Sequence, residues 1–184
     1  SKIYTDLNKI DTSRSRADLK ELVLVAGDLN EEVKSFVPSA DKLEKVFERD
    51  FGGVGEASTM VAKLKGQFAE TKELKIDEAF SKIGSMIKGL NEQGPATTKG
   101  ITEFLSRIGQ LPAAIKPGIA ETAALAAVME EANLTAEISS GGITNILLTA
   151  SKNADEFAKQ FKMSREEFLQ FLTTDPVAFL KRFA

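Results

Sequence analysis

The chain contains no cysteine, no histidine and no tryptophan, and Tyr4 is its single tyrosine. Without cysteine it has no disulfide bond and no thiol nucleophile, and without histidine it lacks the commonest acid–base catalyst. Zinc sites built on sulfur or imidazole ligands are excluded for the same reason. Because most familiar active sites need one of these residues, we expect a protein that is not an enzyme and that uses no cofactor.

Long apolar runs are also scarce. The most apolar stretch, residues 113–129, contains Lys116, Pro117 and Glu121 and is only as long as the shortest membrane-spanning helices. These features favour a buried helix of a soluble protein. The N-terminus does not combine a basic segment with an apolar run, which argues against a secretory signal. We therefore expect no membrane contact by this chain.

Charge of neither sign dominates. The chain has 24 Lys and Arg residues against 27 Asp and Glu residues, which leaves a net charge of −3. A surface without excess positive charge attracts polyanions weakly, so sequence-specific nucleic-acid binding is not expected. With 42% hydrophobic residues, the composition is typical of a soluble globular protein, and 184 residues suit one domain.

Apolar residues recur at helical spacing along the chain, and no stretch alternates as a strand would. The expected fold is all-α, a compact irregular array of about eight to ten short helices. Gly27 is expected to cap the first helix, and Pro38 to separate two short helices. The pair Gly141–Gly142 is expected to open or kink a later helix. Expected helical stripes before the last segment lie at residues 19–26, 31–51, 60–68, 76–90, 101–108, 119–132 and 143–150.

The C-terminal segment carries the clearest local signals. A helix is expected over residues 154–161, where alanine and phenylalanine alternate at helical spacing. Ser164 and Glu167 then have the spacing of a capping box. Asp175 followed by Pro176 is typical of another helix start, because the first turn does not need the missing proline N–H. Three consecutive short helices are predicted.

Phenylalanine is concentrated in the same segment. Six of the 12 phenylalanines lie between Phe157 and Phe183, where they predict a local aromatic core. Part of this cluster could instead be exposed and contact a partner. The candidate partner-contact residues are Phe168, Phe171, Phe179 and Phe183.

For the other candidate sites, a structural role explains the residues better than catalysis or ligand binding does. Adjacent carboxylates such as Glu130 and Glu131 point about 100° apart on a helix, so a solvated surface explains them better than catalysis. The glycines Gly52, Gly53 and Gly55 lack the lysine, the hydroxyl residue and the preceding strand of a phosphate-binding loop. A connection between two helices is the simpler interpretation.

Two stretches carry a family resemblance. The run ETAALAAVMEEANLTAEISSGGITNILLTAS, followed by NADEFAKQFKMSREEFLQFLTTDPVAFLKRF, resembles the core region of phage tail tape-measure proteins of the TP901 type. The resemblance covers about the last 70 residues. Its elements are an Ala-rich helix, a turn with a Gly-containing helix start, a Phe-Ala helix, a Met-Ser-x-Glu-Glu-Phe step and an Asp-Pro ending, at residues 123–128, 134–143, 157–158, 163–168 and 175–180.

The resemblance implies a structural protein of phage or prophage tail assembly. Members of that family set tail length, template polymerisation of the tail tube, and leave during DNA ejection. Implied partners are tail-tube proteins, tail-tip or baseplate proteins, tail-assembly chaperones and other tape-measure copies. Implied locations are the lumen of the virion tail and, during assembly, the bacterial cytoplasm.

The chain is expected to be one all-helical module of a longer tape-measure protein. Residues 1–112 would form its N-terminal helices, and residues 113–184 the part with the strongest resemblance. Helix breakers such as Pro38, Pro112 and Pro117 favour a compact module over an extended measuring helix. Two alternatives stay open: an all-α cellular adaptor that binds partner helices through a Phe-rich groove, and a carrier of lipids or other hydrophobic ligands.

Overall fold

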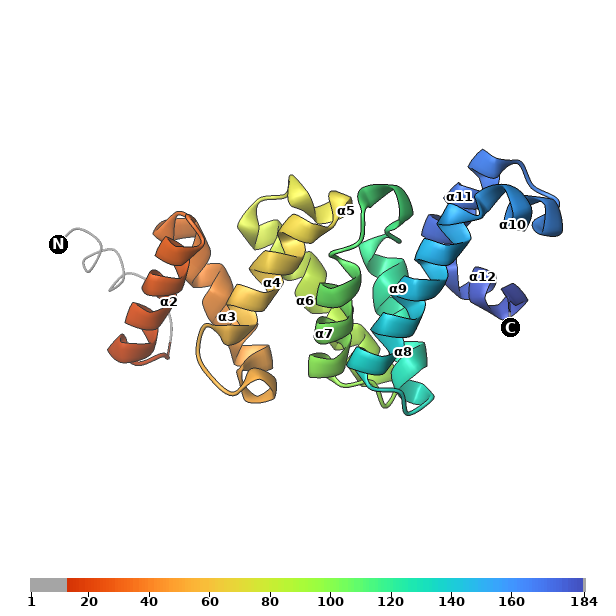
Figure 1. Cartoon of the computed structure of the whole chain (residues 1–184). Helices are drawn as coiled ribbons and strands as arrows, with labels where there is room; N and C mark the ends of the chain where they lie inside the picture. Colours follow the sequence, from red (N-terminus) through yellow and green to blue (C-terminus); the bar gives the residue numbers. More distant parts are fainter. Residues whose placement is uncertain (1–12, 184) are drawn as a thin grey trace. The chain divides into compact units, whose positions relative to one another are not determined.

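The computed structural model describes residues 13–183, apart from the side chain of Glu48. Within these residues the chain forms α-helices, one short 3-10 helix and no strand, which confirms the all-α prediction (Figure 1). Ten of the described helices have at least seven residues, as expected. The elements are α2 (Arg16–Asp28), α3 (Val33–Phe51), α4 (Glu56–Gln67), α5 (Ala69–Lys72), α6 (Ile76–Gln93), α7 (Thr98–Ile108), η1 (Ala113–Ile115), α8 (Ile119–Glu131), α9 (Ala136–Lys152), α10 (Ala154–Phe161), α11 (Arg165–Thr174) and α12 (Pro176–Phe183).

The helices belong to two compact units. Unit 1 comprises the chain up to Gly66 together with Thr71–Ser85, and unit 2 comprises Gln67–Glu70 together with the chain from Met86 onward. The boundary falls inside α6, which contributes its first part to unit 1 and its last part to unit 2. The grouping of one module into residues 1–112 and 113–184 stays a prediction.

The core of unit 1 forms where α2, α3, α4 and the first part of α6 bury their apolar faces. The rings of Phe36 on α3 and Phe80 on α6 meet edge to face, with centroids 5.6 Å apart. Gly84 permits a close approach of α6 to α3, because a Cβ atom there would lie 2.9 Å from Leu43 Cδ1. Other fully buried residues of this core are Leu22, Ala26, Val37, Ala40, Ala57, Leu64 and Ile83.

Pro38 lies inside α3, so the prediction of two short helices meeting at this residue is wrong. Proline removes one backbone donor, but the preceding turn is already closed by Ser35 N–H and Phe36 N–H, which both donate to Glu32 O. Phe36 and Val37 are completely buried beside it. Burial of this apolar face offsets the loss of one hydrogen bond, and the helix continues.

Three helices end in left-handed residues that are not glycine. Gly27 lies within α2, so the prediction that it caps the helix is wrong; Asn30 takes the capping conformation with φ +56°. The N–H of Glu31 then donates to Ala26 O at 2.8 Å, the hydrogen bond expected of this type of helix end. Asn133 after α8 and Lys162 after α10 have the same conformation.

The centre of unit 2 is formed by α7, α8 and α9, which pack against one another. The Ala-rich helix α8 buries Ala123, Leu125 and Ala126, and Ala120, Ala124 and Val128 lie exposed on its other face. Helix α9 starts at Thr135, whose side chain accepts a hydrogen bond from Ile138 N–H. Gly141–Gly142 therefore lies in the interior of α9, and the prediction that this pair opens the helix is wrong.

Candidate functional site

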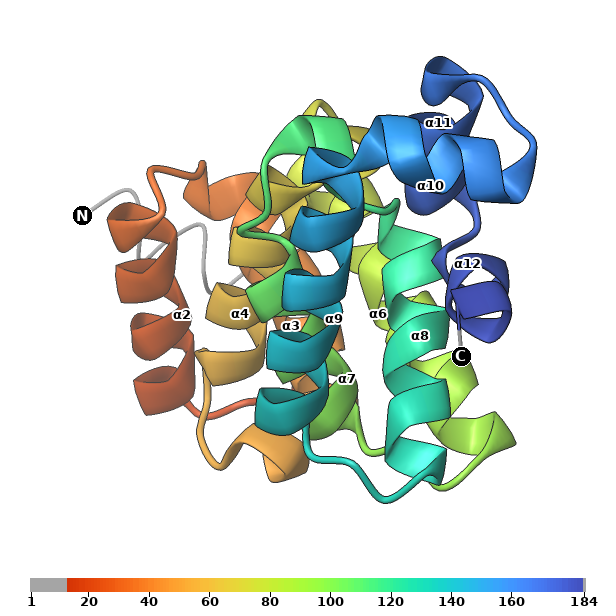
Figure 2. The same ribbon diagram turned by 45° about the vertical axis from the view of Figure 1, so that its right-hand side comes forward.

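The C-terminal helices α10, α11 and α12 follow the sequence signals closely (Figure 2). Ser164 Oγ accepts a hydrogen bond from Glu167 N–H at 3.1 Å, and Glu167 Oε2 accepts one from Ser164 N–H at 2.7 Å. Both bonds of the predicted capping box are therefore present. At the start of α12, Asp175 Oδ1 accepts a hydrogen bond from Ala178 N–H at 2.9 Å. The three predicted helices and the two predicted helix starts are confirmed.

These helices bring six phenylalanine rings into one group, the aromatic cluster. Phe168 lies among Phe157, Phe161 and Phe179, with ring centroids 5.6 to 5.9 Å away. Edge-to-face and offset ring pairs at these distances are favourable beyond the area they bury. The members of the cluster are Phe157, Phe161, Phe168, Phe171, Phe179 and Phe183.

The four candidate partner-contact residues differ in exposure. Phe168 and Phe179 are completely buried inside the aromatic cluster, whereas Phe171 is half-buried. Phe183 is 49% exposed, the largest exposure among the four. Atoms accessible to a partner therefore belong mainly to Phe183 and Phe171, and contact with a partner stays a prediction. The guanidinium of Arg182 lies over Phe171, 5.8 Å from its centroid, and covers part of that ring.

Unit 1 contains a cleft that the sequence signals did not reveal, which we call the Glu44 cleft. It has a volume of about 580 Å³ and lies between the start of α2 and the second half of α3. Both walls carry charged side chains, and no single sign dominates. The described lining residues are Ser13, Arg14, Ser15, Asp18, Glu44, Lys45, Arg49, Gly52 and Gly53.

Glu44 connects α3 to the first turn of α4. Its Oε1 atom accepts a hydrogen bond from Ser58 N–H at 2.8 Å and another from Ser58 Oγ at 2.7 Å. The residue is completely buried, and its Oε2 atom has no hydrogen-bond partner among the described residues. A buried carboxylate oxygen without a donor is unfavourable, so this atom needs an explanation.

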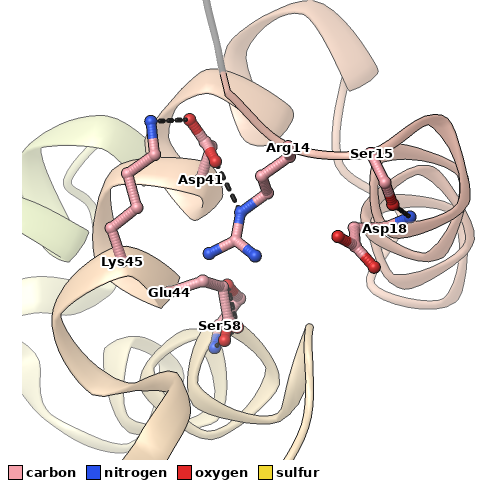
Figure 3. Close-up of polar contacts among 7 residues, drawn as sticks. All are labelled: Arg14, Ser15, Asp18, Asp41, Glu44, Lys45 and Ser58. Atoms are coloured by element: carbon pink, nitrogen blue, oxygen red, sulfur yellow. Dashed lines mark hydrogen bonds and ion pairs between the residues drawn. The ribbon is translucent and has the colours of Figure 1, made fainter.

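Arg14 and Asp41 form an ion pair beside Glu44 (Figure 3). Arg14 Nε donates to Asp41 Oδ1, and Lys45 Nζ lies 2.9 Å from Asp41 Oδ2. The Arg14 guanidinium lies between Asp41 and Glu44, and the carboxylate of Asp18 faces it from the start of α2. The pair joins the residue that precedes α2 to the buried face of α3.

Burial raises the pKa of the Glu44 carboxyl above its ordinary value of 4.5. The two hydrogen bonds from Ser58, the positive charge of Arg14 and the backbone at Gly55 act in the opposite direction and lower that pKa. The cost of desolvation is the largest of these effects. Protonation of Glu44 is therefore easier in the folded protein than in the unfolded chain.

The glycines after α3 lie beside the residues Arg14, Asp41, Glu44 and Ser58, which we call the polar cluster. No strand precedes these glycines within the described chain. Gly55 has a φ of +88°, and a Cβ atom there would lie 2.9 Å from Val25 Cγ2. This turn lets α4 start close to α2 and places Ser58 opposite Glu44. The interpretation as a helix connection is confirmed.

The sequence does contain one signal of the polar cluster, which is the acidic residue Glu44 on the otherwise apolar face of α3. Ala40, Leu43 and Phe47 form an apolar set with helical spacing, and Glu44 occupies the remaining position of that set. An acidic residue on such a face must be buried, so it needs partners. The sequence alone did not show that Arg14 and Ser58 would supply them.

Other candidates from the sequence have structural roles or no site. Glu130 Oε2 accepts a hydrogen bond from Thr97 N–H at 2.5 Å and so stabilises the start of α7. Among the described residues, no group of three or more acidic residues could hold a metal ion. In the same part of the chain, no helix combines the length and apolar character needed to cross a membrane.

Comparison with known proteins gives a match to a family model. The model of a family described as phage-related minor tail protein matches residues 5–175. This range includes every described helix from α2 to α11 and therefore sequence from both compact units. No curated protein and no solved structure matches the chain.

Proposed function

The chain belongs to the phage-related minor tail protein family, and from this membership we propose that it is a folded module of a tail tape-measure protein. The observation that carries the proposal is the extent of the family match, which runs over residues 5–175. The resemblance of the last 70 residues to the tape-measure core region gives the more specific assignment. A role in tail structure follows from the family, and the tape-measure role is our proposal.

The lengths of the helices support a module that does not itself set tail length. A single helix of 184 residues would extend about 276 Å at 1.5 Å per residue. The longest described helix, α3, has 19 residues, which corresponds to about 28 Å. Because the chain folds into short helices in compact units, we propose that it acts in assembly or docking while other parts of the tape measure span the tail.

The proposed partners are proteins of the tail. They are tail-tube, tail-tip or baseplate proteins, tail-assembly chaperones and further tape-measure copies, and the proposed place of action is the tail lumen. The accessible part of the aromatic cluster, at Phe171 and Phe183, is the proposed contact surface. We propose that the segment has no catalytic role, since a chain without histidine and cysteine lacks the usual acid–base and nucleophilic groups.

Tail length tests the proposal. Residues 13–183 are deleted in frame from the parent gene, and tails are measured by electron microscopy. A docking module predicts tails of unchanged length that form in lower number or attach poorly to their partners. Tails shortened by about 257 Å, the helical length of the 171 deleted residues, would overturn the assignment, because the segment would then measure in extended form.

A point substitution keeps the chain length unchanged, so it separates the effect of losing the fold from the effect of shortening the chain. Phe168→Asp places a charge at a completely buried position of the aromatic cluster and should disrupt α10–α12. If the fold matters, this variant should reduce tail number as the deletion does, and tail length should again stay constant. Gln170→Asp, at an exposed position of α11 outside the aromatic cluster, is the matched control for the fold.

A further inference from the structure

The end of α12 carries two positive charges that pair with no acidic group of the described chain. Lys181 and Arg182 lie in the last turn of this helix, and both side chains are exposed. Arg165 in the same unit lies 3.7 Å from Asp155, whereas Lys181 and Arg182 have no such partner among the described residues. The negative end of a helix dipole favours cations in any protein, so charge alone does not make a binding site.

Arg182 differs from an ordinary helix-end cation because it lies over two phenylalanine rings. Its Cζ atom is 5.7 Å from the ring centroid of Phe161 on α10 and 5.8 Å from that of Phe171 on α11. Both distances are within the range of cation–π attraction. Residues of three helices therefore orient one exposed side chain, and a side chain that is already oriented loses less freedom when a partner binds.

The hydrogen-bonding groups of this arginine are free. A guanidinium carries five N–H donors in one plane, and no hydrogen bond joins Arg182 to another described residue. Two parallel donors on one edge of a guanidinium match the two oxygens of a carboxylate. Arg182 is therefore oriented by the rings and still has its full capacity to bind an anionic group of planar shape.

An exposed aromatic ring lies next to this guanidinium in the chain and in the aromatic cluster. Phe183 is 49% exposed, and its ring centroid lies 5.8 Å from that of the buried Phe179. The same Phe179 ring contacts Phe161 and Phe171, with centroids 5.8 and 6.3 Å away. The guanidinium and the exposed ring thus lie at the edges of one small group of rings. We call the surface formed by Phe171, Lys181, Arg182 and Phe183 the Arg182 face.

Building on the contact surface proposed above at Phe171 and Phe183, we propose that the Arg182 face binds an acidic segment of a partner polypeptide, with an Asp or Glu carboxylate on the Arg182 guanidinium and an adjacent apolar side chain on Phe183. The apolar side chain excludes water from the charged pair and so strengthens it. Lys181 adds a second positive charge that attracts such a segment before contact.

Other partner segments fit this face less well. A basic segment would be repelled by Lys181 and Arg182, which lie in one helical turn. A segment that is only apolar would cover the Arg182 guanidinium and leave its N–H donors without an acceptor, which is unfavourable. Only a segment that combines a carboxylate with an apolar side chain satisfies both the guanidinium and the exposed ring.

The test measures peptide binding by NMR in the full chain labelled with ¹⁵N. The probe is acetyl-Gly-Leu-Glu-Leu-Gly-amide, and the matched control carries glutamine in place of glutamate. The glutamate peptide should shift the Arg182 Nε–H signal and the backbone amide signals of α12 saturably. The glutamine peptide should bind about tenfold more weakly or worse, because it lacks the charge of the carboxylate. A peptide with glutamate between glycines should also bind more weakly, because nothing then covers Phe183.

Variants locate the site, with affinity measured from the backbone amide signals of α12. Arg182→Gln should weaken binding of the glutamate peptide by about tenfold or more. Arg182→Lys keeps the charge but lacks the paired donors, so it should also weaken binding. Phe183→Ala should weaken it by a smaller factor. Arg107→Gln removes an exposed arginine on α7 and should leave binding unchanged.

Several results would overturn the proposal. They are the absence of a saturable shift at millimolar glutamate peptide, an equal effect of the glutamine peptide, or unchanged affinity in both Arg182→Gln and Arg182→Lys. Sodium acetate that saturates the same signals as tightly as the peptide would also overturn it, because the face would then bind free anions without recognising a segment.

These results can be told apart from failure of the proposed tail role. If the glutamate peptide does not bind but Phe168→Asp still lowers the number of tails, the tail role stands and the Arg182 face does not bind acidic segments. If the peptide binds as expected but the deletion and Phe168→Asp leave the tails unchanged, the tail role fails and the preference for an acidic segment stands.

Discussion

The polar cluster of unit 1 and the aromatic cluster of unit 2 hold helices together by different means. In the polar cluster, Arg14 donates to Asp41 of α3, and Ser58 of α4 donates to Glu44 of α3. These charged hydrogen bonds lie beside the Glu44 cleft. In α10–α12 six phenylalanine rings form an apolar group around the buried Phe168 and Phe179. Apolar contacts need only shape, whereas each buried charge needs a particular partner. The aromatic cluster therefore depends on how its rings fit together, and the polar cluster depends on which particular residues meet.

Removing a central ring should give the largest effect in this comparison. Phe168→Ala is expected to lower the free energy of unfolding by about 3–5 kcal/mol, because Phe168 is completely buried among three rings. Urea unfolding followed by circular dichroism measures the change. Phe183→Ala at the half-exposed edge should cost clearly less, and equal losses would contradict the described packing.

Breaking the buried ion pair should come next. Asp41→Ala is expected to cost about 3 kcal/mol, since it leaves the Arg14 side chain buried without this partner. Urea unfolding again provides the measurement. Asp155→Ala removes an exposed partner of Arg165 in unit 2 and should cost at most about 1 kcal/mol. Similar effects of the two substitutions would mean that the Arg14–Asp41 pair is accessible to water.

A local change in the aromatic region should be smaller. Ser164→Ala removes the side-chain acceptor of the capping box and is expected to cost about 1 kcal/mol. Faster hydrogen exchange at the first turn of α11 would report the loss. Thr173→Ala, near the exposed end of the same helix, is the control and should leave that turn protected.

The smallest effect should be a pH dependence of unit 1. The folded pKa of Glu44 lies above 4.5, so between 4.5 and that value the folded chain binds more protons than the unfolded chain. Glu44 then contributes stability at low pH that is lost as the pH rises through this interval. Glu44→Gln lacks this contribution.

Urea midpoints at several pH values from about 4 to 7 test the effect in both proteins, because contributions of all other carboxyl groups cancel in the difference. The stability of the wild-type chain relative to Glu44→Gln should fall as the pH rises. A constant difference would show that Glu44 titrates as an ordinary exposed carboxyl group.

Local signals in the sequence were sufficient for most helices but not for three of their details. Pro38 remains inside α3 because buried neighbours offset one lost hydrogen bond. Gly27 does not cap α2, since the left-handed residue is Asn30. Gly141–Gly142 does not start α9, because Thr135 caps it earlier. In each case a strong residue preference was outweighed by packing or by a nearby capping group.

The sequence predicts the aromatic cluster well and the polar cluster poorly. The aromatic cluster follows from phenylalanines at helical spacing and two adjacent helix starts, all within 30 residues. The polar cluster joins Asp41 and Glu44 of α3 to Arg14 and Ser58, which lie 27 residues from Asp41 and 14 residues from Glu44. Only the position of Glu44 on an apolar helix face hinted at it.

The amino-acid sequence by itself determined the all-α class, most helix positions and the local core of α10–α12, because helical periodicity and caps act between residues a few positions apart. Tertiary structure decided which buried charges meet and where a cleft opens. Those outcomes depend on contacts between helices that are distant in sequence, and the cost of burying an unpaired charge is defined only once the helices have packed.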